Sequence, residues 1–395
     1  MRLRILPLVL ATLAASPALA DETPAPADAP ATDPSPVEPP TEAPSPPDDA
    51  VASPVPEDET LIKQNKSGQK KGKKKKKGKP GLVQVSGYLN MVYKMRVERS
   101  GDGTKDPATF RLSKATVRFR GRVNHYVGYT IEIDPRSPTV EGVLRDGYIS
   151  LRHLVPGHEI RIGQQKVPFG YENWLSSTRQ YFLRRSELSE GLARGVTHRD
   201  IGIGLVGKLK LAPGLRLENA IALVNGAGFG VQQDDTHRKN LWGRIGIRYK
   251  SESLGLVIHA GVSGAIGDQF EPEDPGPPLV PASTFSFKRI AGDLEIDHRY
   301  GFLAVEYGTS WDKPAGGSSE QSSAFLITLA GKTPWHVGPA VRYDASDAEG
   351  FTRYTIGGYY GEPKAKFRVL ADYEIYEDDF GKNDGRFGVE GIVVF

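Results

Sequence analysis

Residues 365–376 read AKFRVLADYEIY, and this stretch decides the fold class. Apolar side chains such as Phe367 and Val369 alternate there with charged ones such as Lys366 and Arg368. Successive side chains of a strand point to opposite faces of a sheet. A period of two over this length therefore predicts a β-strand with one apolar face and one polar face.

The same alternation returns between Leu82 and Phe395, in short runs broken by Gly, Pro, Asn and Asp. It is clearest in residues 115–123, 127–134 and 241–248. An antiparallel sandwich would alternate in the same way, so this pattern alone does not distinguish a sandwich from a barrel. We expect sixteen strands, which begin near residues 83, 110, 126, 145, 159, 199, 215, 238, 254, 287, 300, 322, 335, 353, 365 and 386.

The lengths of the connections separate the two folds. Short connections are expected near residues 124, 156, 213, 252, 298, 333 and 362. They alternate with longer ones near 98–109, 135–142, 169–198, 226–237, 265–286, 313–320, 345–352 and 377–384. Short turns at one rim and long loops at the other are typical of an outer-membrane barrel. The fold expected for residues 82–395 is therefore all-β, a 16-stranded antiparallel transmembrane β-barrel with a lumen wide enough for water.

Aromatic residues agree with this prediction. The chain ends in GIVVF, residues 391–395, a last strand with a terminal aromatic residue. This ending resembles the C-terminal signature by which outer-membrane barrels are recognised during assembly. Tyrosines near the expected strand ends predict the aromatic girdles of such a barrel: Tyr88, Tyr93, Tyr126, Tyr129, Tyr249, Tyr300, Tyr343 and Tyr376.

The first twenty residues have the pattern of a secretory signal peptide. A basic start is followed by an apolar core and by a small-residue cleavage site at Ala18–Ala20. The apolar core is too short to span a bilayer comfortably as a permanent helix, so we expect cleavage before Asp21 and not an uncleaved anchor. No later segment contains eighteen consecutive apolar residues, which argues against transmembrane helices.

Residues 21–81 are expected to form a disordered periplasmic linker. Residues 21–60 carry eleven acidic side chains and no basic one, whereas residues 61–81 carry ten lysines and no acidic one. Such a composition cannot bury enough apolar surface to offset its conformational entropy. The polylysine tract Lys70–Lys79 is a solvated tail or, alternatively, a contact to anionic lipid or to the cell wall.

The rest of the chain is nearly neutral, with 39 basic and 37 acidic side chains once residues 1–81 are set aside. A global positive charge is therefore no argument for nucleic-acid binding, and we expect no nucleic-acid partner. The chain has no cysteine, so neither disulfides nor thiolate metal sites stabilise it.

Residues 161–204 carry the most specific local pattern. Residues 161–170 read RIGQQKVPFG, residues 181–186 read YFLRRS, and residues 198–204 read HRDIGIG. These motifs resemble the phosphate-selective porin O/P family, in which a strand ends in Gly-Gln-x-Lys-x-Pro-Phe-Gly. A long third loop follows in that family, and the next strand opens with Arg-Asp-x-Gly. The sixteen-strand pattern extends the resemblance over residues 82–395.

The resemblance implies a third loop folded into the lumen, and a homotrimer. A connection of about thirty residues is longer than an ordinary surface loop and indicates a function. Basic side chains there would lower the barrier for anions in a narrow, water-filled pore. The candidates in and beside the loop are Lys166, Arg179, Arg184, Arg185, Arg194 and Arg199. The alternative is that these cations only brace the loop by pairing with Glu172, Glu187, Glu190 and Asp200.

The family's selectivity also relies on a ladder of lumenal arginines. Basic residues expected on the inward faces of the strands, and so along the anion path, are Arg118, Arg120, Arg122, Arg161, Arg244, Arg248 and Arg368. Acidic residues are expected to point inward as well, namely Glu132, Asp134, Asp293, Glu295, Glu306, Asp372 and Glu374. This mixed lining departs from a purely anionic-solute channel and resembles the transverse field of a general porin.

We therefore expect a passive channel in the outer membrane of a Gram-negative bacterium, with outer-membrane lipid around it. Its solutes would be small and hydrophilic, with a preference for anions, of which phosphate is one candidate. An outer-membrane tether or adhesin is one alternative, and it would conduct little current. A barrel enzyme is the other. The eight histidines are scattered and neither Gly-x-Ser-x-Gly nor His-Glu-x-x-His occurs, so we expect no catalytic residue, no metal and no other cofactor.

Overall fold

The computed structural model describes residues 81–97, 108–136, 140–192, 199–230, 238–271, 283–314, 316–347, 350–377 and 383–395. Apart from Gly81, the expected signal peptide and the linker with its lysine tract lie outside these residues, and so does Arg194. Within the described residues, no helix has the length and apolar character needed to cross a membrane.

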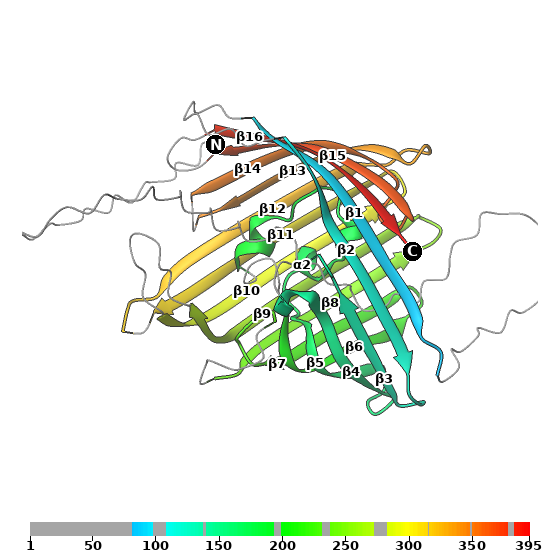
Figure 1. Cartoon of the computed structure of the whole chain (residues 1–395), viewed down its shortest axis with the longest axis vertical. Coiled ribbons are helices and arrows are strands. Elements are labelled where there is room, and N and C mark those ends of the chain that lie inside the picture. The colour runs from blue at the N-terminus through cyan, green and yellow to red at the C-terminus, as the bar shows by residue number, and fades with distance from the viewer. Residues whose placement is uncertain are drawn as a thin grey trace, which may run out of the picture. The chain divides into compact units, whose positions relative to one another are not determined.

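The described residues contain sixteen strands that form one closed antiparallel barrel, as the sequence predicts (Figure 1). Each strand pairs with its neighbours in the sequence, and the last pairs with the first. The strands are β1 (Gln84–Val97), β2 (Thr109–Arg122), β3 (Val127–Ile133), β4 (Leu144–Arg152), β5 (His158–Lys166), β6 (Arg199–Ala212), β7 (Leu215–Val224), β8 (Asn240–Ser251), β9 (Leu256–Glu271), β10 (Ser283–His298), β11 (Gly301–Pro314), β12 (Glu320–Gly331), β13 (Val337–Ser346), β14 (Phe351–Tyr360), β15 (Phe367–Glu377) and β16 (Asn383–Val394).

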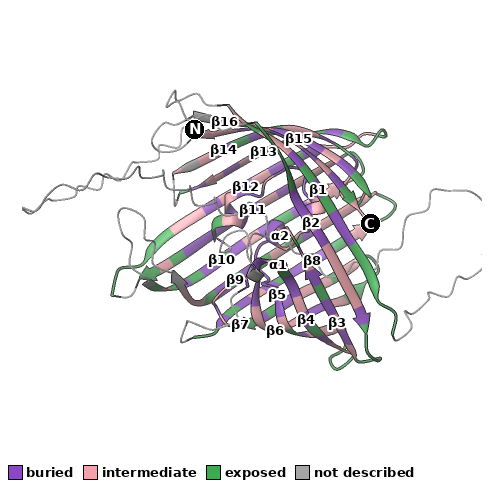
Figure 2. Cartoon of the chain, in the orientation of Figure 1, coloured by how far each residue is buried: buried purple, intermediate pink, exposed green. Residues whose placement is uncertain are grey.

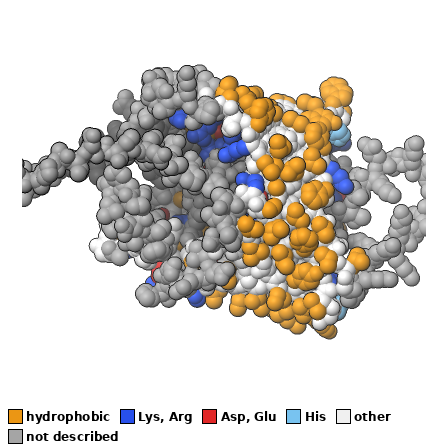
Figure 3. Space-filling view, in the orientation of Figure 1, with side chains coloured by type: hydrophobic (Ala, Val, Ile, Leu, Met, Phe, Trp, Pro, Cys, Tyr) orange, Lys and Arg blue, Asp and Glu red, His pale blue; other side chains and the backbone are white. Residues whose placement is uncertain are grey.

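The side chains are distributed inside out compared with a water-soluble domain. In β8, Leu241, Ile245 and Ile247 are exposed on the outer wall, whereas Arg244 and Arg248 are buried on the lumen side. Figure 2 shows the same alternation of buried and exposed residues along the other strands. Figure 3 shows apolar side chains covering the described part of the visible outer wall. This arrangement suits a wall with hydrocarbon outside and polar groups inside.

The two ends of the described barrel close the ring. Tyr88 of β1 lies opposite Val394 of β16, and the register continues to Val97 opposite Gly385. The terminal Phe395 donates its backbone N–H to the carbonyl of Gly87 at 3.0 Å and accepts the Gly87 N–H at 2.9 Å. A closed ladder leaves no strand edge with unpaired backbone groups, which is what a spanning sheet requires.

The observed strands begin within about four residues of the predicted positions. Three expected long loops are short, however, and one of them, between β15 and β16, comprises residues 378–382 alone. β11 continues to Pro314 and β12 begins at Glu320, so only residues 315–319 connect them. β13 and β14 are joined by residues 347–350 alone. In all three places the strand pairing extends through residues that the sequence pattern assigned to a loop.

The prediction of aromatic girdles holds for some tyrosines and is wrong for others. Tyr126, Tyr249 and Tyr300 are exposed on the outside. Tyr88 is buried on the lumen side. The hydroxyl of Tyr376 accepts a hydrogen bond from Arg184 inside the barrel at 2.6 Å. Both exceptions lie on the polar faces of their strands, so strand phase, and not proximity to a strand end, determines their direction.

The short helices lie in loops. Helix α1 (Val140–Val143) precedes β4. Helix α2 (Tyr171–Trp174), the 3-10 helix η1 (Ser177–Arg179) and the π-helix η2 (Leu188–Leu192) belong to the connection between β5 and β6. We name this connection L3; it spans residues 167–198, of which 167–192 are described. In Figure 1 it is the segment enclosed by the strands, with α2 near the middle of the ring.

Candidate functional site

L3 crosses the lumen and packs against walls on different sides of the barrel. Its start, with Val167 and Phe169, belongs to an apolar cluster with residues of β7 to β10. Its middle, with Tyr181, Phe182 and Leu183, packs against residues of β1 and of β12 to β16. Apolar burial at separate points fixes the path of a loop that has little secondary structure of its own. L3 therefore narrows the channel, as the resemblance implies.

The first turn of L3 is held by a wall carboxylate. Glu306 of β11 accepts the backbone N–H of Tyr171 at 2.9 Å and that of Glu172 at 3.0 Å. Gly170 precedes this turn with φ +67°, and a Cβ there would clash with Oε1 of Glu306. Glycine is therefore required at this position for both conformational and steric reasons. This contact explains the glycine that ends the motif Pro-Phe-Gly in residues 168–170.

Glu172 is the centre of a buried network inside L3. Its Oε2 accepts hydrogen bonds from the Ser186 hydroxyl at 2.5 Å and the Ser189 hydroxyl at 2.9 Å. Its Oε1 accepts from Arg342 of β13 at 2.6 Å. Burial favours a raised pKa, but the guanidinium groups of Arg342 and Arg185 outweigh it and hold the pKa of Glu172 below its usual value. The carboxylate thus stays charged and ties both halves of the loop to the wall.

Arginines of the wall also hold the L3 backbone, through its carbonyl groups. Arg353 of β14 donates to the carbonyl of Arg185 at 2.5 Å. Arg368 of β15 donates to the carbonyls of Thr178 at 2.5 Å and Gln180 at 2.8 Å. Arg289 of β10 donates to the carbonyl of Leu192 at 2.6 Å, and Arg342 to that of Arg184 at 2.7 Å. Charged donors on backbone carbonyls are stronger than neutral ones and also fix direction.

Two of the candidate cations within L3 are used internally. Arg185 donates to the carbonyls of Glu172 and Leu175, within the loop itself. Arg184 donates to the Tyr376 hydroxyl at 2.6 Å and pairs with Glu190 at 3.6 Å. Burial lowers the pKa of Arg184, but the pairing with Tyr376 and nearby acids has the larger summed effect and raises it. The geometry of Arg184 and Arg185 therefore favours the alternative hypothesis, in which these cations brace the loop and do not bind anions.

On β2 to β6, wall arginines and acids form a second network, which we call the acid–arginine cluster. It consists of Arg118, Arg145, Arg199, Glu132 and Asp146. Arg199 binds Asp146 at 2.8 Å and lies 3.6 Å from Glu132. Arg118 pairs with the same two acids. The cluster lies toward the long-loop end of the barrel, where β3 ends and β4 and β6 begin.

The remaining candidates differ in their surroundings. Lys166 ends β5 and is buried, and among the described residues its Nζ has no hydrogen-bond partner. Arg161 donates to Glu159 at 3.0 Å and lies over the ring of Tyr148. Arg120 is half-buried on β2, and Arg122 is exposed at the end of that strand.

The inward acids are buried, as the strand phase predicts, but they do not form a separate acidic wall. Asp293 binds Arg244 through both oxygens, at 2.5 and 2.7 Å. Asp372 accepts the backbone N–H of Leu183 at 2.8 Å. Glu374 lies 3.9 Å from both Arg184 and Arg353. Each of these carboxylates is therefore paired with a nearby base or hydrogen-bonded to the L3 backbone.

Asp200, in the Arg-Asp-x-Gly motif, also has a structural role. Its Oδ2 accepts the backbone N–H groups of Gly226 at 2.8 Å and Gly228 at 3.3 Å. Gly230 donates its N–H to Gln164 at 3.3 Å. All three glycines have positive φ angles, which explains the spacing Gly-x-Gly-x-Gly. This segment binds side chains of the barrel itself, and the next described element after it is strand β8, whereas a dinucleotide-binding loop leads into a helix.

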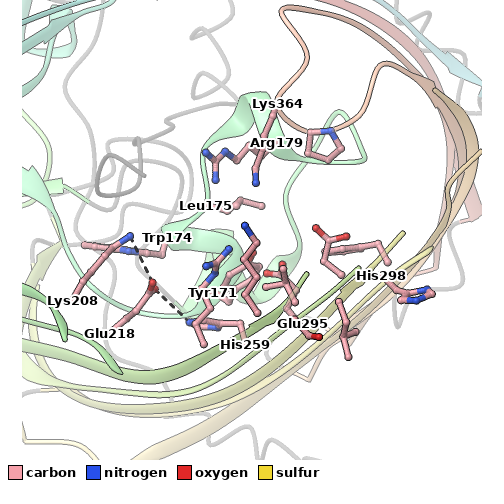
Figure 4. A pocket seen from close by; sticks show the side chains of 18 of the residues that line it. Tyr171, Trp174, Leu175, Arg179, Lys208, Glu218, His259, Glu295, His298 and Lys364 are labelled. Atoms are coloured by element: carbon pink, nitrogen blue, oxygen red, sulfur yellow. Dashed lines mark ion pairs between the residues drawn. The ribbon is translucent and has the colours of Figure 1, made fainter. Parts of the chain in front are cut away.

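A cavity of about 590 Å³ separates L3 from the wall formed by β6 to β11 (Figure 4). L3 contributes Tyr171, Trp174, Leu175 and Arg179, and the short turns contribute residues such as Lys364. We call it the vestibule; it lies between L3 and the short-turn end of the barrel. Three candidate residues line it: Arg179, Arg244 and Arg248.

Sequence reasoning missed several residues that build this site. Arg289, Arg342 and Arg353 hold L3, yet they were not among the candidate arginines. All three lie on polar strand faces, so the alternation that identified Arg368 could have found them too. Lys208 lies on the polar face of β6, so the same alternation could have found it, whereas Lys364 lies in the β14–β15 turn, where alternation gives no direction.

The comparisons with known proteins agree with this geometry. A family model described as phosphate-selective porin O and P matches residues 85–236. A search of the curated proteins finds no match. The trimer form of OmpT, an outer membrane protein of Vibrio cholerae, has a TM-score of 0.56 at 13% identity, covering 80% of this chain and 100% of that chain. An anion-selective porin from Comamonas acidovorans has a TM-score of 0.53 at 12% identity, covering 80% and 99%.

At these identities the solved structures show a common fold. The motifs of residues 161–204 lie within the segment that the family model matches, which confirms the resemblance drawn from them. Residues 85–236 thus match the phosphate-selective porin O and P family, and the barrel shares its fold with solved outer-membrane porins.

Proposed function

We propose that the barrel passes small hydrophilic solutes by passive diffusion and prefers anions, with phosphate among the candidates. One observation carries the anion preference: the charge of the vestibule. Its lining includes the bases Arg179, Lys208, Arg244, Arg248, Lys250, Arg299, Lys332 and Lys364. The acids that line it are Glu218, Glu252, Glu295, Asp297 and Glu362. An excess of fixed positive charge in a narrow, wet passage lowers the barrier for anions.

Some of this charge is neutralised within the wall, which moderates the expected preference. Lys208 lies 3.6 Å from Glu218, Lys332 pairs with Asp297, and Arg244 pairs with Asp293. We therefore expect selectivity by a net field and not by one dedicated site. The anion-selective porin from Comamonas acidovorans, which shares the fold, is consistent with this proposal.

The reversal potential under a salt gradient tests the anion preference. The purified protein is inserted in a planar bilayer with tenfold more KCl on one side, and the measurement is repeated with potassium phosphate. With both salts we expect a reversal potential whose sign indicates anion selectivity. Lys208→Glu should shift the potential toward cation selectivity, whereas Lys210→Glu, near the exposed end of the same strand, should shift it less. A potential of cation-selective sign in the native protein contradicts the proposal.

Three further proposals concern the whole chain. A homotrimer is consistent with the OmpT trimer form among the similar structures, and light scattering of the protein in detergent tests it. Cleavage before Asp21 is tested by sequencing the N-terminus of the exported protein.

A contact of Lys70–Lys79 with anionic lipid or with the cell wall is tested by deleting this tract and measuring how much protein co-sediments with lipid vesicles and with cell-wall fragments. Absence of enzyme activity remains a prediction from the sequence.

A further inference from the structure

The vestibule is unusual for a passage that carries small ions because one side of it is apolar. Tyr171, Trp174 and Leu175 of L3 are only partly buried and line it, together with Phe302 of β11. Figure 4 shows Leu175 and Tyr171 on the L3 side, facing the wall of β7 to β10. Apolar surface in contact with water is unfavourable, and a concave patch of it next to polar groups is typical of a binding site.

The other sides of the vestibule carry charge. On the wall, Nζ of Lys208 lies 3.6 Å from the carboxylate of Glu218, and Nε2 of His259 lies 3.8 Å from the same carboxylate. Arg179 of L3 and Lys364 of the β14–β15 turn line the cavity and lie on the same side of it in Figure 4. Cationic groups thus flank an aromatic and aliphatic surface. A solute that matches both must have an apolar body and a negative group.

We propose that the vestibule is a binding site for aromatic carboxylates, an inference that rests on the proposed channel function. The ring lies against Trp174 and Leu175, and the carboxylate is directed to Arg179 and Lys364. The volume of about 590 Å³ falls within the range of small-molecule sites and exceeds that of a benzoate-sized anion, which leaves room for water. Binding is weak, because a transported solute must also leave.

Aromatic stacking and apolar contact each add to the charge interaction. A carboxylate without a ring, such as acetate, has only the charge contribution, and benzyl alcohol has only the ring. Benzoate should therefore occupy the vestibule at lower concentration than either of them. Removal of the indole of Trp174 should abolish the advantage of benzoate over acetate and leave the binding of acetate unchanged.

The test measures how benzoate, acetate and benzyl alcohol reduce the chloride current of single channels in a planar bilayer. In the native protein, benzoate should halve the current at a concentration about threefold or more below that of acetate. Trp174→Ala should remove this difference. Trp335→Ala is the matched control: Trp335 lies 77% exposed in the β12–β13 turn and should leave the difference intact.

Leu175→Asn makes a smaller change on the same surface and should weaken the benzoate block alone, so the test does not depend on one variant. Arg179→Gln should weaken the block by benzoate and by acetate to a similar degree. Equal block by benzoate and acetate in the native protein would overturn the proposal, and so would a benzoate block that survives both Trp174→Ala and Leu175→Asn. Cation selectivity with an intact benzoate block would refute the anion preference for small ions and leave this site standing.

Discussion

Several charged side chains inside this barrel hold L3. The Glu172 carboxylate, for example, receives bonds from Ser186, Ser189 and Arg342, which join both halves of L3 to β13. Leaving one partner of a buried ion pair uncompensated costs about 3–5 kcal/mol. Arg342→Met should therefore release the middle of L3 and increase the noise of the open-channel current. Arg216→Met, at an exposed position of β7, is the control and should leave the noise unchanged.

The pKa of Glu172 gives a pH dependence with a definite sign. Because its pKa in the folded protein is lowered, its contribution to stability is fully present above the pKa of an unfolded glutamate. This contribution is lost as the pH falls through the lowered value. Current noise should therefore stay constant from pH 7 to about pH 5 and rise only in stronger acid. Glu172→Gln should be noisy already at pH 7, and a quiet variant would contradict the assignment.

At the scale of elements, L3 is fixed from opposite walls. Apolar clusters hold its start and middle, and arginines of β10, β13, β14 and β15 bind its carbonyls. Replacing Arg353 and Arg368 together with alanine removes donors to Thr178, Gln180 and Arg185. The loop should then leave the lumen for part of the time, so that the mean single-channel conductance increases. An unchanged conductance would mean that L3 does not limit the current.

The sequence predicts the strands well because each strand is recognised from the alternation of its own neighbouring residues. Alternation gave all sixteen described strands and the inward direction of Arg244, Arg248 and Arg368. It could not give the partners of these residues. Arg368 binds carbonyls of L3 that are 188 and 190 positions away in the sequence, so its role depends on where L3 crosses the lumen. For the same reason the sequence could not show that Arg368, expected along the anion path, holds the loop.

At the scale of the whole molecule, the barrel depends on an apolar outer wall. Ile245 lies near the middle of β8 and is exposed on that wall. An arginine at the bilayer midplane costs about 2–4 kcal/mol in such barrels, and near the interface about 0–1 kcal/mol. Ile245→Arg should therefore lower the stability to urea in lipid vesicles. Leu254→Arg, in the β8–β9 turn, should lower it much less. An equal loss of stability in both variants would argue against a lipid-facing wall.

The central claim is that this closed barrel encloses a water-filled path narrowed by L3. Single-channel recording in a planar bilayer tests it most directly, with the purified full chain and KCl between about 0.1 and 3 M. The account predicts discrete current steps whose size grows with salt concentration and increases further when Arg353 and Arg368 are replaced. A protein that inserts without producing any current steps would contradict it and would favour a closed tether.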